Sequence, residues 1–261
     1  MRCDRKATAV NEVLVPGVAA QTKNSENPGF LDEMKPITEL NETETWIFDL
    51  DNTLYPASSG LMAEVSSRMT LFVAETLGVA SDTALVEQKR MFREHGTTLR
   101  GLMNDHEVDP DEFMAFVHTV DYTRVDRSPR LATVLSNLPG RKIVYTNASV
   151  AHAESVLDRL GVRDAFAGIF DVAAADYIPK PHPPSYAILA TEHGVDPVHS
   201  VMVEDIAPNL APAAEMGMTT LWVRHDSEPN PYWATPDGEA DYVHHETDDL
   251  LAWLENVVKQ A

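Results

Sequence analysis

The chain has 261 residues and carries 41 Asp and Glu against 20 Lys and Arg, which gives a formal net charge of −21 at pH 7. This balance argues against a nucleic-acid-binding groove, because such grooves need clustered basic side chains to displace counterions from phosphates. With 44% hydrophobic and 23% charged residues, the composition is typical of a globular protein that can bury a core. The length allows one large domain or one domain with an insertion.

The cysteine content and the lengths of the apolar runs limit the cellular location and the kinds of site that the sequence allows. Cys3 is the single cysteine, so an internal disulfide and a thiolate zinc site are excluded, and a reduced, cytoplasmic location is expected. No run approaches the roughly 18 apolar residues that span a bilayer, so no membrane partner is predicted. Residues 1–43 are rich in Asn, Glu, Thr, Pro and Gly and are predicted to be a mostly disordered leader. The sequence does not indicate an oligomeric state.

The first ordered element is predicted at residues 46–50, a short apolar run typical of a strand buried on both faces. From residue 57 to 127 the apolar residues instead recur at spacings of three and four, which predicts helices and no strand. Helices are expected over 61–77, from Ser81 onward, and from Pro110 onward. The methionines of this block fit helix faces and are expected to pack in its interior.

After Pro129 the pattern alternates between strand and helix. Strands are predicted at 142–146, 168–172, 200–203 and 219–223, with helices between them, followed by a short strand near Tyr242 and a last helix over 250–257. Repeated strand–helix units predict a parallel sheet with helices on both faces. The fold class is therefore α/β: a Rossmann-like, doubly wound parallel sheet built from residues 44–56 and 128–261, with an inserted all-helical cap at 57–127.

Polar side chains follow four of the predicted sheet elements in chain order. They are Asp49 and Asp51, then Thr146 and Asn147, then Lys180, and finally the pair Glu204 and Asp205. Each alone has an ordinary structural explanation, such as a turn, a helix cap or a solvated surface lysine. Because ligands of open α/β sheets bind outside the carboxyl ends of the strands, the four together predict a single site at that edge.

These residues lie in four strings that resemble the motifs of the haloacid dehalogenase superfamily of aspartyl phosphohydrolases. The strings are DLDNTLYP from Asp49, VYTNA around Thr146, PKPHP around Lys180 and MVEDIAPN around Asp205. The helical block between the first two resembles the type 1 cap of that superfamily. Together with GTTLRGLM at 96–103, the strings DLDNTLYP and YTNA are most similar to the pyrimidine 5′-nucleotidase branch.

The resemblance implies roles for the acidic residues. Asp49 would be the nucleophile that forms an aspartyl phosphate, and Asp51 would be the general acid and base. Mg²⁺ would be held by Asp49, by the backbone carbonyl of Asp51 and by Asp205, with Glu204 acting through a water molecule.

The remaining motif residues would bind the phosphoryl group. Thr146 would donate a hydrogen bond to a phosphoryl oxygen, and the backbone amide of Asn147 would donate another. Lys180 would offset the negative charge of the carboxylates and the phosphate.

The expected substrate is a small phosphate monoester, with a pyrimidine nucleoside 5′-monophosphate as the first candidate. Alternatives are a sugar phosphatase, a phosphomutase, a haloacid dehalogenase, or a non-catalytic nucleotide-binding protein that retains the fold. Metal-free dehalogenases lack an acid at the position of Asp51, so the resemblance ranks a phosphatase above a dehalogenase. In the cap, Arg100 is a candidate substrate contact, with a surface ion pair to Asp105 or Glu107 as the alternative. His95, His106 and Arg124 are weaker candidates.

Overall fold

The structure is a computed structural model that describes residues 40–224, 233–236, 238 and 240–260. The predicted leader therefore lies outside the described residues, except for its last four. Of these, Leu40–Glu42 form a short 3-10 turn, and Leu40 packs against the hydrophobic core. The described fold thus begins before the predicted boundary at residue 43.

The described residues form one six-stranded parallel sheet with the order β3-β2-β1-β4-β5-β6. The strands are β1 (Thr45–Phe48), β2 (Arg141–Tyr145), β3 (Gly168–Phe170), β4 (Ser200–Glu204), β5 (Thr219–Val223) and β6 (His245–Thr247). β1 lies in the middle, and Ile47 is paired with Ile143 of β2 on one side and Met202 of β4 on the other.

The last strand was predicted near Tyr242, and this position is wrong by three residues. The Thr220 hydroxyl donates to the Tyr242 carbonyl (2.6 Å) and accepts from the His244 backbone N–H (3.0 Å). Side-chain hydrogen bonds therefore replace the backbone ladder at this point, and strand pairing with β5 starts only at His245.

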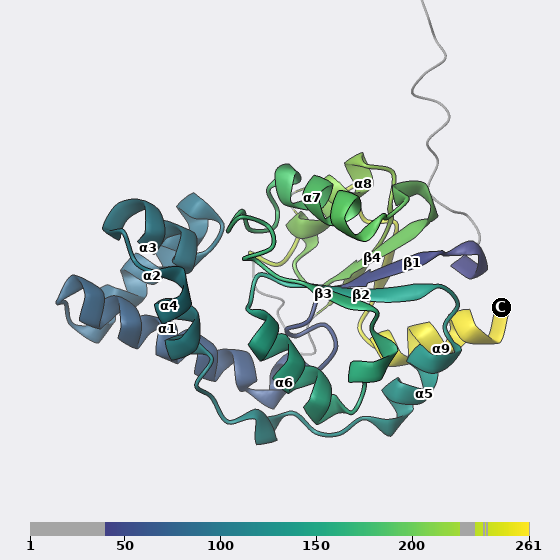
Figure 1. The fold of residues 1–261 in the computed structure, drawn as a ribbon, viewed down its shortest axis with the longest axis horizontal. Coiled ribbons are helices and arrows are strands. Elements are labelled where there is room, and N and C mark those ends of the chain that lie inside the picture. Colours follow the sequence, from purple (N-terminus) through teal and green to yellow (C-terminus); the bar gives the residue numbers. More distant parts are fainter. Residues whose placement is uncertain (1–39, 225–232, 237, 239, 261) are drawn as a thin grey trace, which may run out of the picture. The chain divides into compact units, whose positions relative to one another are not determined.

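Helices cover both faces of the sheet, which confirms the predicted α/β class (Figure 1). α5 (Pro129–Asn137), α6 (Val150–Leu160) and α9 (Leu250–Gln260) pack on one face, and α7 (Pro183–His193) and α8 (Ala211–Glu215) on the other. Successive side chains of a strand point to opposite faces. Trp46 and Phe48 of β1 accordingly join the first layer, and Ile47 joins the second, so this strand is buried on both sides as its sequence predicts.

Five α-helices lie between β1 and β2; α5 packs on the sheet, and the other four gather to the left of it in Figure 1. They are α1 (Leu61–Leu77), α2 (Ser81–His95), α3 (Thr98–His106) and α4 (Pro110–Val117), and residues 56–127, all of which are described, contain no strand. Their apolar faces form a separate cluster that includes Phe72, Met91 and Phe113. The helical cap is therefore present, while its limits at 57 and 127 stay predictions.

None of the described helices alone is long and apolar enough to span a bilayer, and only α1 and α2 taken together, across a bend of 104°, satisfy the length and composition requirements.

The strand order places a crevice at the carboxyl end of β1. From β1 the chain is joined to β2 on one side, and β4 continues the sheet on the other, so the order reverses between β1 and β4. Crevices at such reversals bind ligands in open α/β sheets. The site must therefore be built from the residues that leave these two strands.

Candidate active site

The turn after β1 carries the first acidic residue of the site. The Asp49 backbone N–H donates to the Val203 carbonyl of β4 (2.8 Å), so the ladder continues one residue beyond the strand. The chain then reverses through Asn52, whose φ of 60° is a left-handed conformation that asparagine tolerates better than most residues. This turn brings the Thr53 hydroxyl back to Asp49, where it donates to Oδ2 (3.0 Å).

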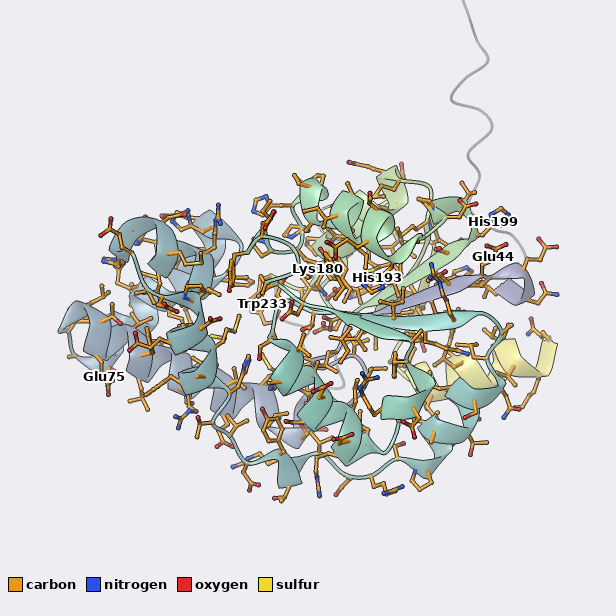
Figure 2. All side chains as sticks on the ribbon, viewed as in Figure 1. Glu44, Glu75, Lys180, His193, His199 and Trp233 are labelled. Carbon is orange, nitrogen blue, oxygen red and sulfur yellow. The ribbon has the colours of Figure 1, made fainter. Side chains whose placement is uncertain are left out.

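Lys180 links the strand ends through its buried ammonium group. Its Nζ donates to Asp49 Oδ1 (2.6 Å), Glu204 Oε2 (2.6 Å) and the Tyr145 carbonyl (3.0 Å), and its side chain is 2% exposed. Figure 2 shows the labelled Lys180 between the sheet and the cap helices. A residue that follows β3 is thus bonded to residues that follow β1 and end β4.

Asn147 fixes the segment that carries this lysine. Its Oδ1 accepts from the Lys180 backbone N–H (2.9 Å), and its Nδ2 donates to the Lys180 carbonyl (3.4 Å). The Asn147 side chain is therefore used for positioning Lys180. The predicted contact of the Asn147 backbone amide with phosphate stays a prediction.

The carboxylates of Asp49, Glu204 and Asp205 form a buried cluster in which one oxygen from each lies within 4.8 Å of the others. Glu204 Oε1 also accepts from the Ile206 backbone N–H (3.2 Å), and the Asp205 carbonyl accepts from the Trp222 indole (2.9 Å). Hard divalent cations prefer oxygen ligands of this kind. These three side chains could therefore hold such a cation.

The electrostatics of the cluster fit a bound cation. Burial raises the pKa of Asp49 to about 7, and the negative charge of Glu204 adds to this effect, whereas Lys180 opposes it. Burial also raises the pKa of Glu204, again against Lys180. Burial alone would lower the pKa of Lys180, but the two carboxylates raise it above its ordinary value. One ammonium thus faces three carboxylates, and a divalent cation would supply the missing positive charge.

Asp51 points its carboxyl group to a different set of partners. Its Oδ1 accepts from the Tyr55 hydroxyl (2.5 Å) and lies 2.9 Å from His152 Nε2. Burial raises the pKa of Asp51, but the charge and hydrogen bond of His152, with the bond from Tyr55, outweigh burial and leave this pKa below its ordinary value. Neither partner was identified from the sequence. Tyr55 lies inside the DLDNTLYP string, while His152 carries no sequence signal.

A cavity of about 590 Å³ lies between the cap and the strand ends. The predicted site residues at the strand ends all line it, namely Asp49, Asp51, Thr146, Asn147, Lys180, Glu204 and Asp205. Thr146 is buried, with its backbone N–H donating to the Phe170 carbonyl (3.0 Å) and its hydroxyl accepting from the Ala148 N–H (3.0 Å). The structure therefore brings these seven residues to one cavity.

The cap wall of this cavity is largely apolar. Its side chains include Met62, Val65, Met69, Leu85, Phe92 and Met114, with Trp233 from the sheet domain. Phe92 and Trp233 meet edge to face, with ring centroids 5.9 Å apart. Met69 and Met114 pack against the cap core as predicted and also line the cavity, whereas Met62 lines the cavity without joining that core.

Arg100 does not line the cavity. The guanidinium Nη1 lies 3.5 Å from the Tyr177 carbonyl, and Asp105 instead lies 3.2 Å from Arg90 Nη2 and 3.5 Å from His95 Nε2. Neither reading of Arg100 from the sequence thus has a counterpart in its hydrogen bonds, and its contact with substrate stays a prediction. His95, His106 and Arg124 also lie outside the cavity lining.

The sequence is similar to a known family and to a yeast protein. Residues 43–217 match the family described as haloacid dehalogenase-like hydrolase. The chain is 25% identical over 193 residues to phosphate metabolism protein 8 of Saccharomyces cerevisiae, a match that covers 67% of this chain and 60% of that protein. It thus spans less than two thirds of that relative.

Two solved structures have a similar fold. An L-2-haloacid dehalogenase from Xanthobacter autotrophicus with chloropropionic acid covalently bound has a TM-score of 0.55 at 16% identity, covering 84% of this chain and 100% of that one. A HAD phosphatase from Thermococcus onnurineus has a TM-score of 0.56 at 17% identity, covering 82% and 97%.

Proposed function

The chain belongs to the haloacid dehalogenase-like hydrolases, and we propose that within this family it is a Mg²⁺-dependent phosphatase acting on a small phosphate monoester through an aspartyl phosphate. The observation that carries this proposal is the pairing of two features. An acid, Asp51, stands two residues after Asp49, and Lys180 is bonded to two members of a buried cluster of three carboxylates. A phosphatase needs both features, whereas halide displacement needs no proton donor for its leaving group.

Two displacements at phosphorus would complete the reaction. In the first, Asp49 Oδ attacks phosphorus, the ester P–O bond breaks, and Asp51 gives its proton to the departing alkoxide. In the second, Asp51 takes a proton from water as the water oxygen attacks the aspartyl phosphate, which releases phosphate and restores Asp49. The lowered pKa of Asp51 suits the second step. The negative charge of an incoming phosphate would raise this pKa toward the protonated form that the first step requires.

The other residues would stabilise charge. Asp49, Asp205 and the Asp51 carbonyl would hold Mg²⁺, with Glu204 beside them. When bound, this ion would neutralise charge on the phosphoryl oxygens and the carboxylates. Lys180 is already held on Asp49 Oδ1 and would keep that carboxylate oriented for attack.

A pyrimidine nucleoside 5′-monophosphate is the substrate that we propose first. Its support is the likeness of the DLDNTLYP, GTTLRGLM and YTNA strings to the nucleotidase branch. The cavity of about 590 Å³ is in the range of pockets for small ligands, and its apolar cap wall with Phe92 and Trp233 offers a surface for a flat base.

The test is a phosphate-release assay on the full chain with UMP, CMP, a hexose phosphate and 4-nitrophenyl phosphate, each with Mg²⁺ and with EDTA. We expect Mg²⁺-dependent phosphate release, fastest with the nucleotides, and its loss in Asp49→Asn. Asp158→Asn, an exposed acid on α6, is the matched control and should retain activity.

Other outcomes would assign the rival functions. Halide release from 2-chloropropionate without phosphate release would indicate a dehalogenase. An isomeric phosphate would indicate a mutase, and a preference for the hexose phosphate would indicate a sugar phosphatase. Nucleotide binding without turnover would favour the non-catalytic alternative.

A further inference from the structure

One histidine without an assigned role touches the reacting groups. His152 lies in the first turn of α6, and its side chain is fully buried, with 0% exposure. Its Nε2 lies 2.9 Å from Asp51 Oδ1, although the two residues are 101 positions apart in the chain. An ionised carboxylate can only accept hydrogen bonds, so His152 Nε2–H is the donor.

The two hydrogen bonds to Asp51 fall on the same oxygen. Tyr55 and His152 both donate to Oδ1, whereas Oδ2 accepts no hydrogen bond from the residues that the structure describes. The Asp51 side chain is 15% exposed and lines the cavity. Oδ1 is therefore held on the protein side, and Oδ2 is the oxygen left for exchanging a proton with a ligand.

The imidazole ring of His152 is itself held from the other side. The Tyr122 hydroxyl, which donates to the His118 carbonyl (3.1 Å), also lies 3.1 Å from its Nδ1, in the segment that returns from the cap to the sheet. The His118 ring stacks on it, with centroids 4.3 Å apart and an angle of 24° between the planes. Contacts at Nδ1, at Nε2 and on one ring face leave the imidazole one orientation.

We propose that His152 is the positioning residue for the acid and base of the reaction: with Tyr55 it pins Oδ1 of Asp51 and so presents Oδ2 to the leaving group. This inference rests on the proposed phosphatase function. It follows from geometry, because a carboxyl group turns about its Cβ–Cγ bond, and holding Oδ1 with two hydrogen bonds fixes the direction of Oδ2. To protonate the leaving group in the transition state, Oδ2 of Asp51 must point toward the leaving oxygen.

A purely structural role would lower activity toward all substrates alike, whereas misplacing the acid harms only esters that need a proton. Phenyl phosphate and 4-nitrophenyl phosphate have the same ring, but nitrophenolate leaves readily without protonation. The ratio kcat/KM reports the steps up to loss of this leaving group, so later hydrolysis of the phospho-enzyme does not obscure it.

We expect His152→Leu, measured with saturating Mg²⁺, to lower kcat/KM for phenyl phosphate by about 10-fold or more and for 4-nitrophenyl phosphate by less than about 3-fold, since general acid catalysis contributes about 10²–10⁴. His152→Gln, which keeps a side-chain N–H, should recover part of the phenyl phosphate activity. Glu154→Gln, an exposed change on the same helix, should alter neither.

Tyr122→Phe keeps the ring and removes the hydroxyl beside Nδ1. It should also lower kcat/KM for phenyl phosphate more than for 4-nitrophenyl phosphate, but by less than His152→Leu does. It carries the test if His152→Leu does not fold. Equal losses for both esters, or no loss, would overturn the role of His152 while leaving the proposed function intact. Absence of phosphate release by the wild-type protein would overturn the proposed function and this inference together.

Discussion

Lys180 is the best residue for testing the electrostatics of the site. Among the described residues, it is the one cation within hydrogen-bonding distance of the buried carboxylate cluster. Lys180→Met retains much of the side-chain volume and removes the ammonium that bonds Asp49 and Glu204, both at 2.6 Å. Both carboxylates are then left buried without a partner of opposite charge, at 6% and 1% exposure. We expect a large loss of stability together with the loss of activity.

The size of this loss follows from the cost of leaving buried charges unpaired. Removing one partner of a buried ion pair costs about 3–5 kcal/mol of unfolding free energy. At about 2–4 °C per kcal/mol for a domain of this size, the melting temperature should fall by roughly 6–20 °C.

The loss should depend on pH and on metal. The pKa of Asp49 is already raised to about 7 and would rise further without the ammonium, so the folded state binds more protons than the unfolded state. Stability of the variant therefore falls as pH rises through this range, and the deficit should be larger at about pH 8 than at about pH 6. Mg²⁺ should restore part of it, because the ion replaces the lost charge.

Lys142→Met is the matched control, measured by thermal unfolding under the same conditions. Lys142 is also buried, at 8% exposure, but it donates to the Leu138 carbonyl and forms no ion pair with a described carboxylate. We expect a small change that neither pH nor Mg²⁺ alters. Equal melting of the two variants at both pH values would refute the view that Lys180 offsets excess carboxylate charge.

Three further predictions concern the cap, the metal and the cavity. Gly101→Ala should destabilise the protein by about 1–3 kcal/mol in thermal unfolding, since its Cβ would lie 2.5 Å from Met91 Cβ and force α2 from α3; an unchanged melting temperature would contradict this packing. Mg²⁺ affinity, measured by calorimetry, should weaken as pH falls below about 7, because the ion must displace the proton of Asp49; a flat profile would contradict the assignment. Phe92→Ala should raise KM for UMP more than it lowers kcat, because it removes cavity wall beside Trp233; a change confined to kcat would exclude this role.

The strands and the acidic edge of the sheet were predictable because burial constrains their sequence. A strand covered on both faces is mostly apolar, as β1 is, although β1 ends at Phe48 and not at the predicted residue 50. Alternation of strands and helices then implies parallel order, which brings residues after separate strands to one edge. Asp49, Lys180 and Glu204 could be grouped on this argument although 131 and 24 positions separate Lys180 from the other two.

Other features depended on contacts that no local pattern records. α3 was not predicted: it has only nine residues and contains Gly101, which weakens the helical pattern, although the Thr97 side chain caps its start by accepting from the Arg100 N–H. Apolar spacing placed Met62 and Met69 on one side of a helix, but the identity of the facing surface, a cavity, follows only from the packing of the cap. The bond between His152 and Asp51 joins two segments whose approach is decided by the whole sheet.

The charge of the site also bears on the order in which its ligands bind. The chain as a whole is strongly acidic, and three carboxylates with one ammonium leave the site itself negative. A phosphate ester would meet repulsion there unless a cation is bound first, because fixed charges within a few ångströms outweigh the more distant surface. Calorimetry with inorganic phosphate, a product of the proposed reaction, should therefore detect binding with Mg²⁺ and none with EDTA. Equal phosphate affinity in both would mean that the backbone amides and the cavity cations Lys89, Arg93 and Lys180 suffice, and that the carboxylate cluster serves another purpose.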